Sequence, residues 1–172
     1  MYLLKNKCLY IIILFIISAP IFSQTYIMTN NGSVSTCSGV FLDPGGAVNY
    51  QNNLNYVYTL CPSNPGSLIQ LDFTMFDVEA GWDYLEIYDG GNTTSPLIGQ
   101  FDGNQLQGIT IAATNPSGCL TFEFYSDFIV TESGWSANIS CALPCQTVQA
   151  NLASSNPTIN SNYEISICQG NT

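Results

Sequence analysis

Basic side chains are almost absent from this chain of 172 residues. Lys5 and Lys7 are the two cationic residues, and arginine and histidine are absent, whereas twelve carboxylates lie between Asp43 and Glu164. Such a surface does not attract a phosphate backbone or an anionic membrane without a basic partner. We therefore expect no nucleic-acid binding and, once the N-terminal segment is cleaved, no membrane insertion. Clustered carboxylates without cationic neighbours repel one another or take up a divalent metal ion, although a dispersed acidic surface also aids solubility.

The same absences narrow the available chemistry. Without histidine, neither a Ser–His nor a Cys–His nucleophile pair exists, and histidine zinc sites are excluded. Beyond Lys7 no lysine remains to form a Schiff base. A carboxylate pair acting on a glycoside is the main chemistry left. We therefore expect this segment not to be an enzyme.

The N-terminus has the pattern of a secretory signal peptide. Two lysines precede an apolar run over residues 9–17, and small residues follow it up to Ser23. The run is shorter than a membrane span of about 20 residues, although an uncleaved anchor is the alternative. We predict cleavage after Ser23, with Ala19 as the other candidate. The remaining 149 residues (172 − 23) then carry a net charge of 0 − 12 = −12.

Six cysteines follow the predicted signal peptide, and no two have the C-x-x-C spacing of a metal site. An even number in an exported chain indicates three disulfides. Six cysteines permit 15 pairings. Pairing nearest neighbours predicts three bonds, each closing a loop worth about 3 kcal/mol: Cys37–Cys61, Cys119–Cys141 and Cys145–Cys168.

Helical periodicity is missing throughout, whereas short alternating runs are frequent. In residues 119–125, for example, Leu120, Phe122 and Phe124 alternate with polar residues or tyrosine, which predicts a strand with one buried face. Clusters of Gly, Pro, Asn and Ser separate such runs. We predict an all-β, antiparallel two-sheet β-sandwich of eight to ten strands, with strands at 55–60, 67–76, 83–88, 97–101, 108–113, 119–125 and 135–139.

Composition changes after Cys141. The 31 residues that follow (172 − 141) are rich in Asn, Ser, Thr and Gln and contain one acidic residue, Glu164. About thirty residues are too few to bury a core of their own. The predicted organisation is a signal peptide (1–23), an N-terminal linker (24–35), a β-sandwich domain (36–141), and a linker with the truncated start of a second β domain (142–172).

Five motifs occur in fixed order along the predicted domain. They are Phe76–Glu79, Asp83–Gly90, Leu97–Phe101, Phe122–Asp127 and Gly134–Asn138. The run D-Y-L-E-I-Y-D-G and the later S-D and G-W pairs are specific when they occur together, and with them residues 36–141 resemble a CUB domain. The resemblance implies a jelly-roll-like sandwich used for extracellular recognition. The compact loops are similar to those of CUB domains in secreted bacterial proteins, and the C-terminal stub resembles an Ig-like or PKD-like module.

Many members of this family hold Ca²⁺ at one end of the sandwich, and the resemblance places the ligands at Glu79, Asp83 and Asp127. Three converging carboxylates suit an ion that takes six to eight oxygens. Where the family often has Ser and Asn after the last ligand, this chain has Ile129 and Val130. The tyrosine that supports the family's site aligns with either Tyr50 or Tyr56.

Three tyrosines alternate with acidic residues on the expected strands. Tyr84, Tyr88 and Tyr125 form a possible ligand surface for a sugar or a cationic peptide, with cross-strand packing of exposed tyrosines as the alternative.

The leading hypothesis is a calcium-binding adhesion or recognition module of a secreted or cell-surface protein, which binds an extracellular protein or carbohydrate. The alternatives are a substrate-docking domain of a secreted protease or glycosidase and a structural spacer, with further domains following in either case.

Overall fold

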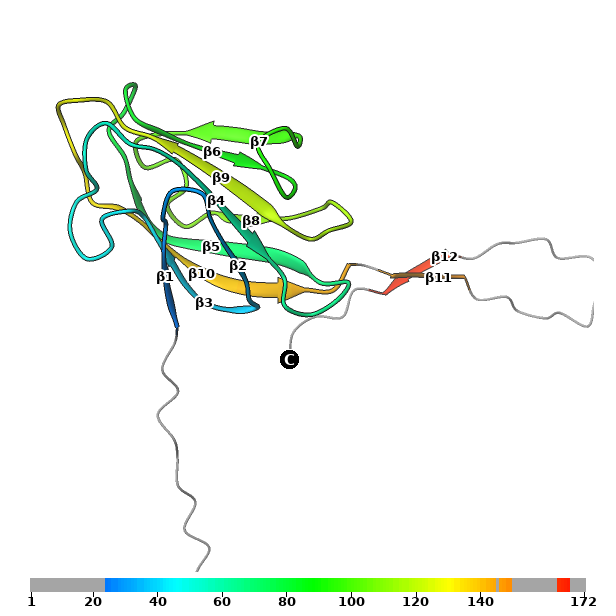
Figure 1. The fold of residues 1–172 in the computed structure, drawn as a ribbon. Coiled ribbons are helices and arrows are strands. Elements are labelled where there is room, and N and C mark those ends of the chain that lie inside the picture. The colour runs from blue at the N-terminus through cyan, green and yellow to red at the C-terminus, as the bar shows by residue number, and fades with distance from the viewer. Residues whose placement is uncertain (1–23, 145, 150–163, 168–172) are drawn as a thin grey trace, which may run out of the picture.

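A computed structural model describes residues 24–144, 146–149 and 164–167. Ten strands form two packed five-stranded sheets, and a separate hairpin follows (Figure 1). The sandwich strands are β1 (Thr25–Ile27), β2 (Gly32–Ser35), β3 (Ser38–Leu42), β4 (Asn55–Cys61), β5 (Leu68–Asp77), β6 (Tyr84–Tyr88), β7 (Leu97–Phe101), β8 (Thr110–Ala112), β9 (Leu120–Tyr125) and β10 (Gly134–Ala142). The hairpin pairs β11 (Gln146–Gln149) with β12 (Glu164–Ile167).

The predicted all-β sandwich is confirmed, and all seven predicted strands are present with slightly shifted ends. One sheet has the order β1-β3-β10-β5-β8 and the other β2-β4-β9-β6-β7. Two pairs, β1–β3 and β2–β4, run parallel, although the prediction was antiparallel. Successive strands from β1 to β4 lie in alternate sheets. As a result, β3 runs in the same direction as β1 beside it, and β4 runs in the same direction as β2. No described residues form a helix long and apolar enough to cross a membrane.

Residues 24–35 were expected to be a linker, but they contribute β1 and β2. These short strands pair with β3 and β4 at one edge of each sheet. Met28, between them, is 1% exposed and belongs to the core. Strands of three and four residues are too short to show a recognisable alternation of apolar and polar residues in the sequence.

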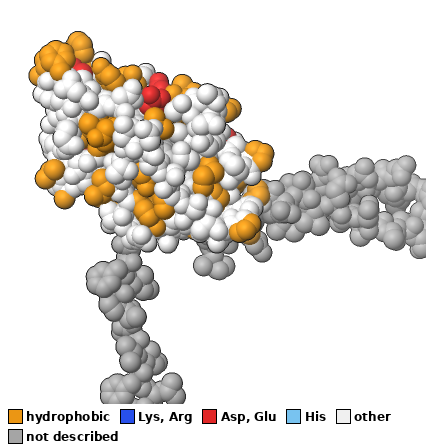
Figure 2. All heavy atoms as spheres, in the orientation of Figure 1, with side chains coloured by type: hydrophobic (Ala, Val, Ile, Leu, Met, Phe, Trp, Pro, Cys, Tyr) orange, Lys and Arg blue, Asp and Glu red, His pale blue; other side chains and the backbone are white. Residues whose placement is uncertain are grey.

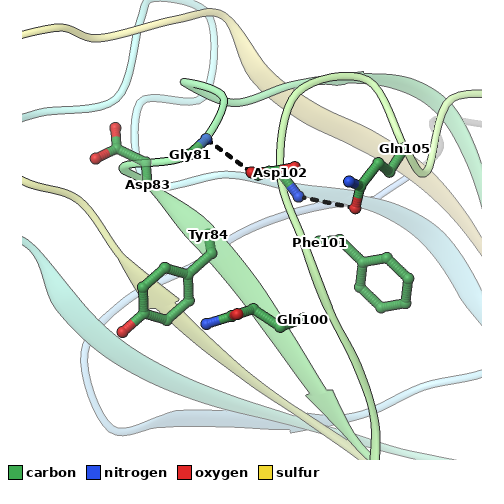
Figure 3. A pocket seen from close by; sticks show the side chains of 7 residues that line it. All are labelled: Gly81, Asp83, Tyr84, Gln100, Phe101, Asp102 and Gln105. Atoms are coloured by element: carbon green, nitrogen blue, oxygen red, sulfur yellow. Dashed lines mark hydrogen bonds between the residues drawn. The ribbon is translucent and has the colours of Figure 1, made fainter.

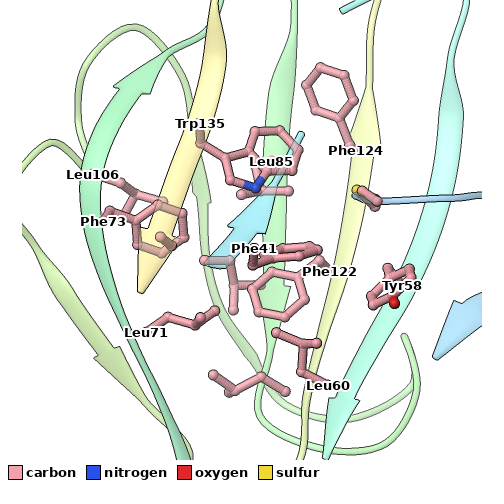
Figure 4. Close-up of a cluster of buried hydrophobic side chains, with 14 of the residues drawn as sticks. Phe41, Tyr58, Leu60, Leu71, Phe73, Leu85, Leu106, Phe122, Phe124 and Trp135 are labelled. Carbon is pink, nitrogen blue, oxygen red and sulfur yellow. The ribbon is translucent and has the colours of Figure 1, made fainter. Parts of the chain in front are cut away.

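The core lies between the sheets and is rich in aromatic side chains (Figure 4). Phe41 lies at its centre, with ring centroids 5.0 Å from Phe122, 5.5 Å from Tyr58 and 6.0 Å from Trp135. Burying each such side chain contributes about 1.5–3 kcal/mol. A bulge in the pairing of β5 with β10 interrupts strict alternation. Phe73 and Phe76, three positions apart, are therefore both buried.

The disulfide pairing predicted from nearest neighbours is wrong. Cys37 bonds to Cys141, and Cys61 bonds to Cys119. Cys37 precedes β3 and Cys61 ends β4, and these strands belong to different sheets; Cys119 before β9 and Cys141 in β10 are likewise divided between the sheets. Antiparallel pairing of β3 with β10, and of β4 with β9, instead brings the observed partners opposite each other at strand ends.

Parts of the prediction lie outside the described residues. The expected signal peptide, Cys145 and Cys168 are among these. The hairpin of β11 and β12 is described, but its assignment to an Ig-like or PKD-like module stays a prediction.

Candidate metal centre

Three carboxylates from separate segments meet at one end of the sandwich. Glu79 follows β5, Asp83 precedes β6, and Asp127 lies just after β9. Each contributes a carboxylate oxygen, and these oxygens all lie within 4.8 Å of one another. The structure thus brings together the three residues that the resemblance named, over a sequence separation of 48 residues (127 − 79).

A buried tyrosine fixes the centre of this cluster. The Tyr50 hydroxyl donates to Asp83 Oδ2 at 2.7 Å and accepts from the backbone N–H of Glu79 at 3.1 Å. The backbone N–H of Asp127 donates to Asp83 Oδ1 at 2.7 Å. Asp83, only 1% exposed, is therefore bound to both neighbouring segments. The alternatives Tyr50 and Tyr56 are resolved in favour of Tyr50, which lies 1% exposed in the loop before β4.

The loop that carries Asp127 is held by the segment before β4. The Ser126 hydroxyl donates to the carbonyl of Gln51 at 2.7 Å and accepts from the N–H of Leu54 at 3.0 Å. The N–H of Asn53, a residue with φ of 60°, donates to the Asp127 carbonyl at 2.6 Å. These bonds hold the backbone segment that carries the Asp127 carboxylate.

The electrostatics of the cluster favour a cation. Burial raises the pKa of Glu79, and the charges of Asp127, Asp83 and Glu132 raise it further. Glu79 Oε2 is buried and has no hydrogen-bond partner among the described residues. An unpaired buried carboxylate oxygen is costly unless a cation or donor satisfies it. An oxygen-only donor set with three negative charges fits Ca²⁺.

Asn52 is a polar neighbour of the site that the sequence analysis missed. Its Nδ2 donates to the carbonyl of Ile129 at 3.1 Å, while its Oδ1 is buried without a partner in the described part of the chain. The Ile129 N–H in turn donates to Asp127 Oδ1 at 3.0 Å. No motif distinguishes Asn52 in a sequence rich in asparagine, so only the fold reveals its position.

An apolar surface borders the cluster. Trp82, Phe128 and Ile129 are 65%, 69% and 64% exposed, and with Val130 they line a cavity of about 290 Å³ that also contacts Glu79 and Asp127. Hydrophobic side chains gather at this tip, over the loop between β9 and β10 (Figure 2). The Trp82 indole lies on the surface because the residue sits in the turn between Glu79 and Asp83.

The three tyrosines lie on the outer face of the β6–β9 pair. Tyr84 and Tyr125 stack with ring centroids 5.2 Å apart and an interplanar angle of 20°, which is the expected cross-strand packing. Tyr88 lies further along β6, and its hydroxyl donates to Glu86 Oε2 and also lies 3.4 Å from Glu123 Oε2. Glu86 and Glu123 are direct cross-strand partners. Hydrogen bonds to these carboxylates and the nearby negative charges raise the pKa of Tyr88.

The domain is thus a two-sheet β-sandwich with an acidic cluster at one end. The CUB domain model matches residues 30–139, and the chain belongs to this family. CUB domains are typically extracellular, non-catalytic binding modules. Several relatives are large proteins. Human cubilin is 33% identical over 138 residues (73% of this chain, 4% of cubilin), and human neuropilin-1 is 33% identical over 116 residues (62% and 12%).

Solved structures support the fold. The human MASP-1/3 CUB1-EGF-CUB2 region aligns with a TM-score of 0.55 and 22% identity over 67% of this chain and 43% of that chain. The crystal structure of the MASP-1 CUB2 domain bound to Ca²⁺ aligns with a TM-score of 0.53 and 21% identity over 65% of this chain and 99% of that domain. The resemblance to compact bacterial members stays a prediction.

Proposed function

We propose that this domain is a non-catalytic extracellular recognition module whose ligand-binding end is organised by Ca²⁺. The observation that carries the proposal is the convergence of Glu79, Asp83 and Asp127, where a buried Glu79 oxygen has no hydrogen-bond partner in the described ranges. Beyond Lys7 the chain offers no cation of its own to neutralise them. A CUB domain of the same fold binds Ca²⁺. Two disulfides fit secretion or display at the cell surface.

The partner proposed for this end is an extracellular protein. Trp82, Phe128 and Ile129 expose a large apolar area beside the metal centre, and exposed apolar patches of this kind mark interaction sites. Bound Ca²⁺ would join the loops that carry Trp82 and Phe128, because Glu79 and Asp83 flank the first loop and Asp127 begins the second. The ion would thereby hold the apolar surface in one arrangement and lower the entropy lost on binding.

Thermal unfolding in EDTA, calcium and magnesium tests the metal. Binding to the folded state alone stabilises it by about 2.7 kcal/mol at a hundredfold excess over Kd, which corresponds to a rise in Tm of roughly 10 °C for a domain of this size. Magnesium should act much less, because it demands tighter octahedral geometry. Trp82 fluorescence gives a second readout, since the other tryptophan, Trp135, is fully buried.

Matched variants separate the site from general charge effects. Asp127→Asn removes one charge from the cluster and should abolish the calcium-dependent rise in Tm. In EDTA it should be no less stable than the parent, because a repulsive charge is gone. Asp72→Asn removes an exposed charge from β5 and should respond to calcium as the parent does. Identical melting curves in EDTA and millimolar calcium would refute the metal site.

A further inference from the structure

A second cavity lies beside the metal centre but has a different chemistry. It has a volume of about 310 Å³, at the small end of ligand pockets, and lies between the start of β6 and the end of β7 (Figure 3). Asp83 also borders it, but that carboxylate already accepts from Tyr50 and Asp127. The other lining residues are Gly81, Tyr84, Gln100, Phe101, Asp102 and Gln105.

Its polar groups have spare hydrogen-bonding capacity. Asp102 Oδ2 accepts from the N–H of Gly81 at 2.7 Å, and Gln105 Oε1 accepts from the N–H of Asp102 at 3.2 Å. Among the described residues, Asp102 Oδ1 and Gln105 Nε2 have no hydrogen-bond partner. Gln100 Nε2 makes one long contact of 3.4 Å, to Glu86. One carboxylate and two amides therefore offer both acceptors and donors to a ligand.

An aromatic ring completes the site. Tyr84 lies next to Gln100 in Figure 3, and one face of its ring stacks on Tyr125, which fixes the ring's orientation. A carboxylate in the cavity, with no basic side chain beyond Lys7, disfavours an anionic ligand. A predominantly polar lining disfavours an apolar one. A neutral molecule with vicinal hydroxyls and an apolar C–H face matches this combination of amide, carboxylate and aromatic groups.

We propose that this cavity binds a neutral saccharide unit, with the Tyr84 ring contacting its C–H face and with Gln100, Asp102 and Gln105 binding its hydroxyl groups. The volume suits one sugar residue of a longer chain. Of the three proposed metal ligands only Asp83 borders the cavity, and because both of its carboxylate oxygens already accept hydrogen bonds, the proposed saccharide contacts do not use the metal centre. The inference does not depend on the calcium proposal, and the two can fail independently.

A glycan array tests this site. The full chain, biotinylated and tetramerised on streptavidin, is applied to neutral oligosaccharides, to their sulfated and sialylated counterparts, and to immobilised oligolysine. Neutral glycans should bind, while their anionic counterparts and oligolysine should not. Titration with the strongest neutral glycan then gives affinities for the variants. The array result is contradicted if no neutral glycan binds, or if oligolysine alone binds.

The variants identify the cavity. Tyr84→Ala should weaken binding about tenfold and Gln100→Ala about three- to tenfold, as expected for loss of one ring contact or one hydrogen bond. Tyr84→Phe keeps the ring and should retain most of the affinity, and Tyr88→Phe, outside the cavity, should retain all of it. Gln100 is exposed, so its substitution leaves the fold intact. Binding that survives both Tyr84→Ala and Gln100→Ala but disappears in Asp127→Asn would place the sugar on the metal and overturn the proposal.

Discussion

The buried carboxyl group of Asp43 should make the protein more stable as the pH falls from 7 to 4. Asp43 is fully buried, and burial raises its pKa from 3.8 to about 6, although the N–H groups of Gly45 and Trp135 partly offset the effect. These groups donate to its two carboxylate oxygens at 2.7 and 3.3 Å. A raised pKa means that the folded state binds the proton more tightly than the unfolded state.

The sign and size of the effect follow from this difference in pKa. Stability associated with protonated Asp43 is fully present below the unfolded pKa and is lost as pH rises through the folded value near 6. A difference of about two pKa units corresponds to about 3 kcal/mol. Most of that should appear between pH 7 and pH 4.

Urea unfolding at several pH values in EDTA measures this contribution. Asp43→Asn cannot titrate at this position, so its unfolding free energy should depend less on pH than that of the parent, by about 2–3 kcal/mol over this range. Other carboxylates titrate in both proteins, so the difference between the two curves isolates Asp43. Asp72→Asn, exposed on β5, should follow the parent. Parallel curves for the parent and Asp43→Asn would refute the reasoning.

Two further predictions concern the disulfides and the glycine at the start of β10. Non-reducing peptide mapping should recover Cys37–Cys141 and Cys61–Cys119, and replacing Cys61 and Cys119 together by serine should lower the unfolding free energy by up to about 4 kcal/mol; a Cys37–Cys61 peptide would contradict the sheet assignment. Gly134→Ala should lower the unfolding free energy, measured in urea, by about 2 kcal/mol or more. Gly134 has φ of 74°, and an added Cβ would collide with the Asp43 carboxyl group. Gly91→Ala meets no atom within 4 Å and should be nearly neutral. Equal stabilities for the two glycine variants would contradict it.

Strand positions could be predicted from the sequence because burial of one sheet face places an apolar side chain at every second residue of a strand. Leu120, Phe122 and Phe124 illustrate the pattern, and all three are fully buried. The partner of each strand could not be predicted in the same way, because alternation does not specify which strand lies alongside. The wrong disulfide pairing has this origin, since Cys37 bonds to a residue 104 positions away.

The sequence predicts which carboxylates form the candidate metal centre, but not the hydrogen bonds that position them. The motifs indicated three carboxylates, yet the hydrogen bonds from Tyr50 and from the Asp127 N–H to Asp83 depend on loops that meet only in the folded chain. Asn52 and the exposed apolar side chains carry no motif. Asn52, Phe128 and Ile129 lie near the cluster because the segment before β4 packs against the loop after β9, and Trp82 lies there because its turn joins Glu79 to Asp83.

Calcium and pH should affect the two candidate sites differently. At the metal centre, Glu79, Asp83 and Asp127 concentrate charge that no side chain neutralises, so its occupancy should depend on calcium and on pH. In the second cavity, Asp102 is held by the N–H of Gly81, a residue of the loop between Glu79 and Asp83. A ligand bound there rests against a loop that the metal would order. Calcium should therefore tighten saccharide binding modestly without being required for it, and a saccharide affinity that is the same in EDTA and in calcium would show that the two sites are energetically uncoupled.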